Sequence, residues 1–337
     1  MSPRVSVLLP LRDAGPDLEV ALDSLTRQTL ADYELVAVDD GSVDGSGEAL
    51  ERRARADFRL RVIRQPRRGL VAALNAGLAA CSAPYVARMD ADDVSHPRRL
   101  ELQAELLDRR PEVGVASCLV RCFPRRRVEE GFRLYEQWLN SLVEPVAIAR
   151  ERFVESPVAH PSVVVRRQLL EDAGGYRDLG WAEDYDLWLR LLEAGVGFAK
   201  VERCLLFWRE GGQRLTRVEP RYTGERFLEC KAHFLARGPL RDRGRVVIWG
   251  AGKSGRRLAT HLVARDQRLV AFVDIDPAKV GRTVRGAPVV AAEDLPGLLR
   301  DRLVILAAVP SRGARQLIRA KLDRLGLGEG RDYWCVA

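Results

Sequence analysis

The sequence has no apolar run long enough to cross a membrane, no secretory signal pattern and no CxxC cysteine motif. A transmembrane helix needs about 20 mainly apolar residues in a row. We therefore expect a cytoplasmic protein without a membrane-spanning segment, and we leave contact with the inner face of the membrane open.

Cysteine and lysine are both scarce. Cys118 and Cys122 are the closest pair among six cysteines, and no second cysteine or histidine pair completes a zinc site, so we expect reduced, structural thiols. Only five residues are lysine, so the net charge of +8 comes almost entirely from arginine. No basic stripe is interleaved with aromatic residues, so we expect no nucleic-acid partner. Anionic ligands, an anionic membrane surface and ordinary solvated surface all remain open.

Length and composition are typical of a globular protein with two domains. The chain has 337 residues, of which 47% are hydrophobic and 30% charged. Residues 237–245 are charged, interrupted by glycine and proline, and without periodicity, as expected of a linker. We therefore predict a first domain at 1–236, a linker at 237–245 and a second domain at 246–337.

Strands alternate with helices in the first half of the chain. Apolar runs typical of strands cover residues 5–9, 34–38, 61–63 and 85–89. Apolar residues at helical spacing follow them, at 18–25, 45–56, 70–78 and 98–109. This order predicts an α/β fold with a parallel sheet wrapped by helices.

Acidic residues follow two of these strands directly. Asp39 and Asp40 come after the second strand, and the fourth ends in a cluster formed by Asp90, Asp92 and Asp93. Parallel strands bind ligands at their carboxyl ends, so the two acidic groups are expected to converge. The first could accept hydrogen bonds from a nucleobase and ribose, and the second could hold Mg²⁺ or Mn²⁺ on a diphosphate. The alternative for either is a solvated turn that caps the next helix.

Five ordered motifs resemble those of family 2 glycosyltransferases. They are Val-Ser-Val-Leu-Leu-Pro at 5–10, Ser-Leu-Thr-Arg-Gln-Thr at 24–29, Val-Asp-Asp-Gly-Ser at 38–42, Leu-Asn-Ala-Gly at 74–77 and Met-Asp-Ala-Asp-Asp at 89–93. The resemblance covers residues 4–217. It implies a GT-A fold, a nucleotide-sugar donor, and a reaction assisted by Mg²⁺ or Mn²⁺ that inverts the anomeric centre.

The resemblance also implies roles for individual residues at the acidic strand ends. Asp40 matches the aspartate that contacts the donor base. Asp90 matches the first acid of the DxD motif, near the ribose, and Asp92 matches its metal ligand. Pro10, which ends the first motif, is expected to belong to the donor site.

Three further positions are candidates for the site, and two of them keep an alternative interpretation. Arg68 lies near a position where the family often places a basic side chain close to the donor. Asn75 matches a motif asparagine, with helix packing as the alternative. His160, in the sequence Ala-His-Pro, could line the acceptor site or lie near the metal, and the alternative is a buried, hydrogen-bonded structural histidine.

A third acidic group opens the helix predicted at 180–192. Glu183 and Asp184 fall in its first turn, where the helix dipole stabilises acids without any catalytic purpose. The segment also resembles the family's Glu-Asp motif, in which Asp184 takes the position of the catalytic base and Glu183 belongs to the substrate site. A carboxylate there can take the proton from an acceptor hydroxyl as it attacks the anomeric carbon. Trp181 could stack on a sugar ring or pack in the core.

Two departures from the family pattern narrow the expected function. Glu-Gly-Gly at 210–212 replaces a stretch that usually contains histidine, so we expect no metal-binding histidine there. The sequence also lacks a Gln-x-x-Arg-Trp motif and a transmembrane helix. Both absences argue against a processive membrane synthase and favour the addition of a single sugar.

The second predicted domain begins with a strand, a glycine-rich turn, a helix and a strand that ends in an acid. Gly250, Gly252 and Gly255 form a GxGxxG motif, and Asp274 follows at the expected distance. In a Rossmann-like unit these positions would hold the diphosphate and ribose of NAD or a nucleotide-sugar. No acid, base or nucleophile gives this domain a reaction of its own, so a bound nucleotide and an empty docking scaffold both stay open.

These patterns together predict a GT-A type nucleotide-sugar-binding domain followed by a small Rossmann-like parallel α/β domain. The predicted function is transfer of one sugar from a nucleoside-diphosphate sugar, with a UDP-sugar favoured, to an acceptor hydroxyl in cell-surface glycan or polysaccharide synthesis. The acceptor would be a glycan, a lipid-linked molecule or a small molecule. The rival functions are an NAD-dependent oxidoreductase centred on the C-terminal domain and a noncatalytic sugar-nucleotide-binding scaffold.

Overall fold

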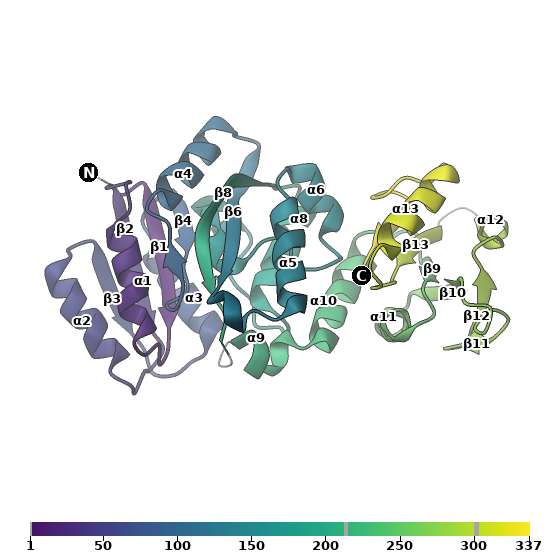
Figure 1. The fold of residues 1–337 in the computed structure, drawn as a ribbon, viewed down its shortest axis with the longest axis horizontal. Helices are drawn as coiled ribbons and strands as arrows, with labels where there is room; N and C mark the ends of the chain where they lie inside the picture. The colour runs from purple at the N-terminus through teal and green to yellow at the C-terminus, as the bar shows by residue number, and fades with distance from the viewer. Residues whose placement is uncertain (1, 212–214, 300–302) are drawn as a thin grey trace. The chain divides into compact units, whose positions relative to one another are not determined.

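The computed structural model of the protein describes residues 2–211, 215–299 and 303–337 (Figure 1). Internal contacts divide the chain into two compact units. The first comprises Met1–Ala149, Pro157–Leu179 and Glu183–Arg217, and the second comprises Arg150–Ser156, Gly180–Ala182 and Val218–Ala337. Residues 212–214, which include the last glycine of the Glu-Gly-Gly stretch at 210–212, fall outside the described residues. Within the described ranges, no helix has the length and hydropathy of a membrane span.

Strands and helices alternate along the first unit. The strands are β1 (Val5–Leu11), β2 (Tyr33–Asp39), β3 (Leu60–Arg64), β4 (Tyr85–Arg88), β5 (Val94–Ser95), β6 (Val113–Phe123), β7 (Val164–Arg166) and β8 (Gly197–Arg209). The helices up to residue 218 are α1 (Asp17–Thr26), α2 (Ser46–Ala56), α3 (Leu70–Ala80), α4 (Arg99–Arg109), α5 (Glu130–Ser141), α6 (Pro145–Glu151), α7 (Arg167–Asp172), α8 (Glu183–Glu193) and α9 (Leu215–Val218). Every strand and helix predicted between residues 5 and 109 is present.

The sheet of the first unit has the strand order β3-β2-β1-β4-β7-β6-β8-β5. β1 lies between β2 and β4 and is parallel to both, with Val5 opposite Tyr33 on one side and Tyr85 on the other. This register brings the carboxyl ends of β2 and β4 to the same edge, as predicted. β7 runs antiparallel to both β4 and β6, so the sheet is mixed, which the alternation of strands and helices did not indicate.

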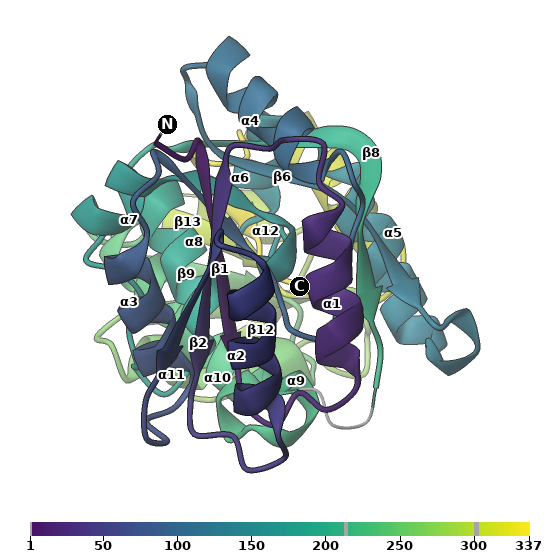
Figure 2. The same cartoon turned by 90° about the vertical axis from the view of Figure 1, so that its left-hand side faces the viewer.

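Side chains of β1 alternate between two hydrophobic cores. Val7 and Leu9 pack with apolar residues of α1, α2 and α4, whereas Leu8 packs with residues of α3 and α8. Figure 2 shows α1 and α3 on opposite sides of β1. Because helices cover both faces, every residue of β1 is buried, which explains why all but one of its residues are apolar.

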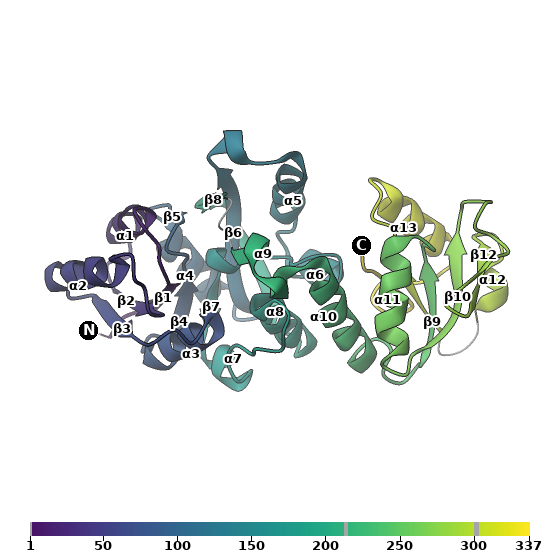
Figure 3. The same ribbon diagram turned by 90° about the horizontal axis from the view of Figure 1, so that it is seen from below.

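The two longest strands described, β6 and β8, were not predicted. They pair in parallel, and their register shifts on both sides of Leu119. β8 also contains the polar stretch 200–204, which breaks the apolar alternation that identifies a strand. α5 lies alongside β6 (Figure 3). The predicted amphipathic helix around Trp138 is therefore present, but the strand it covers was missed.

The second unit contains a smaller sheet. Its elements are α10 (Gly224–Arg237), β9 (Arg245–Trp249), α11 (Lys253–Val263), β10 (Arg268–Asp274), β11 (Thr283–Val284), β12 (Ala287–Ala291), α12 (Leu295–Leu298), β13 (Leu303–Ala307), α13 (Ala314–Arg324) and β14 (Tyr333–Cys335). The strand order is β11-β12-β10-β9-β13-β14, and all neighbours are parallel except β11 and β12. This confirms a small parallel α/β domain at the C-terminal end of the described chain.

Polar contacts explain why a segment around residue 151 belongs to the second unit. The carboxylate of Glu151 pairs with Arg315 at 3.1 Å and with Arg319 at 2.6 Å, both from α13. The ammonium group of Lys231 in α10 donates to the carbonyl of Val154 at 2.7 Å. The division also assigns α10 to this unit, whereas we predicted the boundary after it, at 237–245.

Helix α3 approaches the sheet closely at Gly77. A Cβ atom there would lie 2.2 Å from Leu8 Cδ1 and 2.9 Å from Val38 Cγ2, and both neighbours are fully buried. We expect Gly77→Ala to lower the free energy of unfolding by about 1–3 kcal/mol, the usual cost of overpacking, despite the better helix propensity of alanine. Urea unfolding followed by circular dichroism checks this.

Gly131→Ala is the matched control for this substitution. Gly131 lies in α5, and no atom lies within 4 Å of a Cβ added there. That variant should be as stable as the wild type, or more stable by up to about 1 kcal/mol. Equal unfolding midpoints for the two variants would contradict the close packing at Gly77.

Candidate active site

Asp40, directly after β2, is held by the loop that precedes α3. Its Oδ1 accepts hydrogen bonds from the backbone amide of Arg68 at 2.8 Å and from Nε2 of Gln65 at 2.6 Å. Its Oδ2 accepts one from the amide of Gly69 at 2.8 Å. The carboxylate is 95% buried and fixes this loop at the carboxyl edge of the sheet, where the side chain of Arg68 is exposed.

Asn75 ties α3 to the segment around residue 176. Its Nδ2 donates to the carbonyl of Tyr176 and its Oδ1 accepts from the amide of the same residue, both at 2.9 Å. These contacts agree with the alternative interpretation, in which Asn75 serves helix packing. Pro10 is buried in β1, opposite Val38 of β2.

Asp90, Asp92 and Asp93 lie in the turn between β4 and β5. One carboxylate oxygen from each lies within 4.8 Å of the others. Arg209 of β8 orders this turn: its amide donates to Asp93 Oδ1 at 2.7 Å, and its Nε donates to the carbonyl of Asp92 at 2.6 Å. Three carboxylates held this closely are suitable oxygen ligands for Mg²⁺ or Mn²⁺.

Arg88, the last residue of β4, is the buried cation of this site. It is 4% exposed, and its guanidinium forms an ion pair with Asp90. Its carbonyl oxygen accepts hydrogen bonds from the guanidinium of Arg99, whose own burial lowers the pKa of Arg99 to about 10. Because a buried charge is costly unless paired, Arg88 holds Asp90 at the end of the sheet. We did not predict this residue, although an arginine inside an apolar strand was a usable signal.

Glu183 and Asp184 begin helix α8. Glu183 is 1% exposed, whereas Asp184 is partly buried and accepts a hydrogen bond from the amide of Tyr185 at 2.7 Å. Burial raises the pKa of Asp184 to about 7, and the negative charge of Glu183 contributes to the rise. The positive charge of Arg88 acts in the opposite direction. A carboxylate with a pKa near neutrality suits a general base.

His160 lies beside these carboxylates. Its Nε2 is 2.9 Å from the hydroxyl of Tyr176, and its Nδ1 is 4.0 Å from Oε1 of Glu183. Its ring meets that of Trp188 edge to face at 5.7 Å. Burial and the charge of Arg88 lower the pKa of His160 well below its usual value, so the ring is neutral at pH 7. These contacts are those of a buried, hydrogen-bonded histidine.

The charge of one arginine thus acts on two of the predicted acidic groups. Asp90 pairs with Arg88 directly, and the charge of Arg88 also shifts the pKa of Asp184. Trp181 belongs to the second unit, where its buried ring lies 5.5 Å from that of His233 in α10. This contact is the packing alternative predicted for Trp181.

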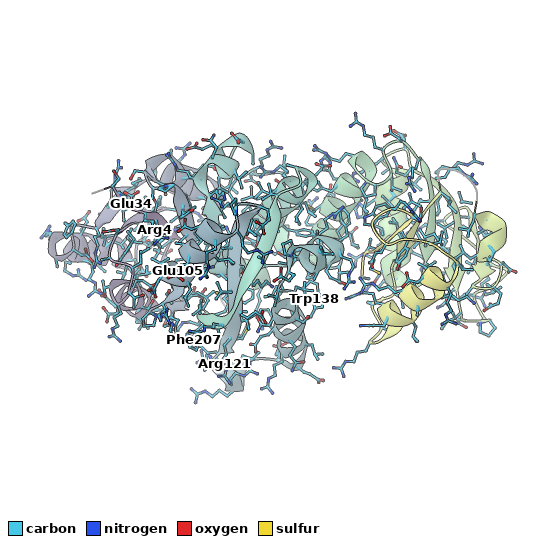
Figure 4. The ribbon with its side chains drawn as sticks, turned by 90° about the horizontal axis from the view of Figure 1, so that it is seen from above. Arg4, Glu34, Glu105, Arg121, Trp138 and Phe207 are labelled. Atoms are coloured by element: carbon cyan, nitrogen blue, oxygen red, sulfur yellow. The ribbon has the colours of Figure 1, made fainter. Side chains whose placement is uncertain are left out.

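An aromatic cluster joins α5 to β8. Its members are Phe132, Tyr135, Trp138 and Trp208, with ring centroids 5.4 to 6.4 Å apart in the contacting pairs. Figure 4 labels Trp138, together with Arg121 and Phe207, which are register partners on β6 and β8. The weak sequence pattern between residues 119 and 153 gave no indication of this cluster.

In the second unit, the glycine-rich turn connects β9 to α11 as predicted. A Cβ atom at Gly255 would lie 2.0 Å from the carbonyl oxygen of Gly250, so only glycine lets the helix pack this closely. Gly250 itself has a φ of 120°, a backbone conformation that favours glycine. No atom lies within 4 Å of a Cβ added at Gly252, so the middle of the turn is open.

Asp274, at the end of β10, is engaged by its own domain. Its Oδ2 accepts a hydrogen bond from the amide of Ala251 at 2.9 Å, and its Oδ1 accepts one from the amide of Asp276 at 3.0 Å. The ammonium group of Lys279 lies 3.2 Å from Oδ2. A ribose bound here would compete with Lys279 for the carboxylate.

This fold and these carboxylates define a glycosyltransferase of the GT-A type. The chain shares the fold of residues 1–349 of TarS from S. aureus, solved with UDP-GlcNAc, at a TM-score of 0.57 and 17% identity, over 78% of this chain and 72% of that fragment. Residues 6–174 match the family model described as Glycosyl transferase family 2. The chain belongs to this family, which confirms the resemblance predicted from its motifs.

Similar proteins act in polysaccharide synthesis. The amylovoran biosynthesis glycosyltransferase AmsE of Erwinia amylovora is 34% identical over 63% of this chain and 78% of its own. An Escherichia coli UDP-Gal:alpha-D-GlcNAc-diphosphoundecaprenol beta-1,3-galactosyltransferase is 28% identical over 62% of this chain and 74% of its own. Residues 241–325 match a second family model, described as CoA binding domain.

Substitution of Asp40 tests whether its carboxylate holds the loop before α3 or binds the donor. In Asp40→Asn one acceptor oxygen becomes an NH₂ group that faces a backbone donor, so we expect a loss of about 1–3 kcal/mol in stability. Thermal unfolding measures this, with the exposed Asp32→Asn as the matched control. Wild-type stability combined with lost donor affinity would instead mean that the carboxylate serves the donor and not the loop.

Proposed function

We propose that the protein transfers one sugar from a nucleoside-diphosphate sugar to an acceptor hydroxyl, with a divalent metal and with inversion of the anomeric centre. The observation that carries this proposal is that two groups of carboxylates respond to the charge of Arg88: Asp90 with its neighbours in the β4–β5 turn, and Asp184 at the start of α8. One group suits a metal ligand and the other suits a base.

Asp92 would hold Mg²⁺ or Mn²⁺, and Asp90 would lie near the donor ribose. The spacing of the three carboxylates in this turn fits a hard cation that keeps several positions for water and phosphate. When bound, the metal neutralises charge on the departing diphosphate. Arg209 keeps the turn in place through the backbone of Asp92 and the side chain of Asp93.

The donor base and ribose would bind at the carboxyl ends of β1 and β2. Pro10 and the loop organised by Asp40 flank this position, and the exposed Arg68 would bring a positive charge towards the diphosphate. Asn75 would contribute indirectly, by fixing the backbone at Tyr176. UDP is favoured as the nucleotide, because the galactosyltransferase relative is named for UDP-Gal and TarS was solved with UDP-GlcNAc.

Asp184 would remove the proton from the acceptor hydroxyl as its oxygen attacks the anomeric carbon. Burial of Asp184 is the main cause of its raised pKa, the charge of Glu183 raises the pKa further, and the charge of Arg88 favours the ionised form. An attack from the side opposite the leaving diphosphate inverts the anomeric centre. This reaction needs no carboxylate nucleophile, so one base is sufficient.

The acceptor would be a glycan, a lipid-linked molecule or a small molecule of cell-surface glycan or polysaccharide synthesis. The names of the relatives support this class, since one acts in amylovoran biosynthesis and another on a diphosphoundecaprenol-linked sugar. A lipid-linked acceptor would bring the protein to the cytoplasmic face of the membrane. Trp181 would serve packing against His233 rather than sugar stacking.

The C-terminal domain is proposed as a binding or docking module without chemistry of its own. The turn at Gly250 and Gly252 would face a nucleotide, NAD or a nucleotide-sugar, at the start of α11, and Gly255 would let the helix pack closely behind it. The engagement of Asp274 by Lys279 and by two backbone amides makes an active dehydrogenase the weaker alternative. Titration with NADH separates the two, because tight binding with hydride transfer would favour the oxidoreductase.

The pH dependence of the reaction tests Asp184. A base with a pKa of about 7 is mostly protonated below that pH, so kcat/KM should rise about tenfold per pH unit up to a break near 7 and then level off. Asp184→Asn should lower kcat by about 10²-fold or more while leaving donor affinity intact. Steady-state kinetics with a UDP-sugar panel would measure both.

Glu183→Gln provides the matched electrostatic control. It removes the neighbouring negative charge that raises the pKa of Asp184, so the break should move to lower pH. A break that stays in place, or an Asp184→Asn enzyme with near-normal turnover, would contradict the assignment of the base.

Metal titration tests Asp92. In Asp92→Asn the affinity for Mn²⁺ in the presence of UDP should fall by at least about tenfold. Substituting even a residue that only supports a metal ligand lowers the metal affinity by about that factor. Electron paramagnetic resonance of free Mn²⁺ gives the affinity, and Asp32→Asn is the control. Unchanged Mn²⁺ binding would remove Asp92 from the metal site.

A further inference from the structure

Tyr176 and His160 are buried near the proposed base, and neither has a part in the proposed reaction. The hydroxyl oxygen of Tyr176 lies 2.9 Å from Nε2 of His160. The second ring nitrogen of His160, Nδ1, lies 4.0 Å from Oε1 of Glu183. His160 therefore connects the hydroxyl of Tyr176 to the carboxylate that precedes Asp184 in the chain.

The backbone before and at Tyr176 is fixed from two helices. Asn75 of α3 bonds both the amide and the carbonyl of Tyr176, each at 2.9 Å. From α8, the guanidinium of Arg190 donates to the carbonyl of Ala173 at 2.7 Å and to the carbonyl of Gly175 at 2.9 Å. A tyrosine held in this way keeps its hydroxyl in one place, because its side chain has only two rotatable bonds before the ring.

The imidazole ring of His160 is also fixed. His160 begins the 3₁₀ turn η2 (His160–Ser162). The centroid of its ring lies 5.4 Å from that of Tyr176 and 5.7 Å from that of Trp188. Because the ring packs against two aromatic neighbours, each nitrogen keeps its polar neighbour: the hydroxyl at Nε2 and the Glu183 carboxylate at Nδ1.

These neighbours favour one of the two neutral forms of His160. Burial, with a further contribution from the charge of Arg88, lowers the pKa of His160 well below its usual value, so the ring carries a single proton. Burial raises the pKa of Tyr176, so its hydroxyl keeps its proton and is able to donate. An imidazole that accepts this hydrogen bond at Nε2 carries its own proton at Nδ1. That N–H faces the carboxylate of Glu183, and at 4.0 Å their attraction is electrostatic rather than a hydrogen bond.

We propose that Tyr176 is a positioning residue whose hydroxyl holds His160 in the form protonated at Nδ1, so that an N–H group stabilises the negative charge of Glu183 beside the base. Glu183 of the same helix and Arg88 of β4 are charged groups that act on Asp184, in opposite directions. A change in the charge of Glu183 therefore changes the pKa of Asp184. This inference rests on the proposed function, because Asp184 is the base only in that reaction.

Nitrogen NMR of the full-length protein with ¹⁵N-labelled histidine tests the proposal without any substrate. The chain has four histidines, and His160→Gln identifies the signals of His160 by their loss. At neutral pH the wild-type ring should show a protonated Nδ1 and an unprotonated Nε2. In Tyr176→Phe, which removes the hydroxyl and keeps the ring, the fraction protonated at Nε2 should rise.

Tyr33→Phe is the matched control. The buried hydroxyl of Tyr33 in β2 donates to the carbonyl of Leu25 at 2.9 Å, so this variant also loses one buried hydrogen bond of the same domain. The two variants should be destabilised to a similar extent in thermal unfolding. Tyr33→Phe should leave the signals of His160 unchanged.

The pH profile of sugar transfer gives the second measurement, with the UDP-sugar panel as donors. Tyr176→Phe weakens the stabilisation of the Glu183 anion, so the pKa of Asp184 falls and the break in kcat/KM moves to lower pH, as in Glu183→Gln. A shift of about half a unit raises kcat/KM at pH 6, relative to its plateau, about two- to threefold. KM for the donor should stay the same, and Tyr33→Phe should not move the break. A merely structural role of Tyr176 would lower activity and stability without moving it.

A wild-type His160 protonated at Nε2, or a break that stays in place in Tyr176→Phe, would overturn the proposal. Because the NMR signals need no sugar donor, a failure of this inference is distinguishable from a failure of the proposed function. The Nδ1-protonated form in a protein that transfers no sugar would contradict the transferase function and support the positioning of His160 by Tyr176.

Discussion

A guanidinium group buried at the end of a β-strand needs an anion to pair with. In the candidate active site the buried guanidinium is that of Arg88, and the anion is Asp90. Arg88 lies at the end of β4, inside the sheet, and pairs with Asp90 in the turn that follows. Removing Asp90 would leave an uncompensated buried charge, which is among the most destabilising changes a protein can undergo. The position of the acidic turn therefore follows from the stability of the fold itself.

The positive charge of Arg88 also affects the pKa values of His160 and Asp184. Burial and, to a lesser extent, the charge of Arg88 lower the pKa of His160 and keep the histidine neutral, and the charge of Arg88 also favours the ionised form of Asp184. Burial and Glu183 act in the opposite direction on Asp184. Asp90 in the acidic turn and Asp184 at the start of α8 thus respond to one buried cation, and the antiparallel strand β7, which pairs with β4, brings the segment after His160 beside β4.

Much of the first domain could be predicted because its strands are buried on both faces. β1, β2 and β4 are mainly apolar, and the aspartates at 40, 90 and 92 stand out because they follow directly on such runs. β8 escaped prediction because polar residues break its pattern, and β7 because its direction depends on long-range pairing. Arg88 was overlooked because its role depends on two residues that the strand pattern does not connect to it. One is its ion-pair partner Asp90, and the other is Asp184, almost a hundred residues further along the chain.

For some residues the sequence left a substrate-site role and a packing role equally open. Asn75 and Trp181 each matched a substrate-site position, and each proved to be engaged in packing: Asn75 with the backbone of Tyr176, and Trp181 with the ring of His233. Motifs preserve residue type, but only the fold shows which neighbours a side chain has. The acidic turn and the start of α8 retain their chemical interpretation because their neighbours are charged groups rather than packing partners.

The most direct test of this account is a crystal structure with Mn²⁺ and UDP, using anomalous scattering to locate the metal. The account predicts an Mn²⁺ peak within about 2.5 Å of an Asp92 carboxylate oxygen, with Arg88 still paired to Asp90 and with Asp184 facing the sugar end of the diphosphate. A metal bound away from this turn, or a diphosphate whose sugar end points away from Asp184, would contradict it.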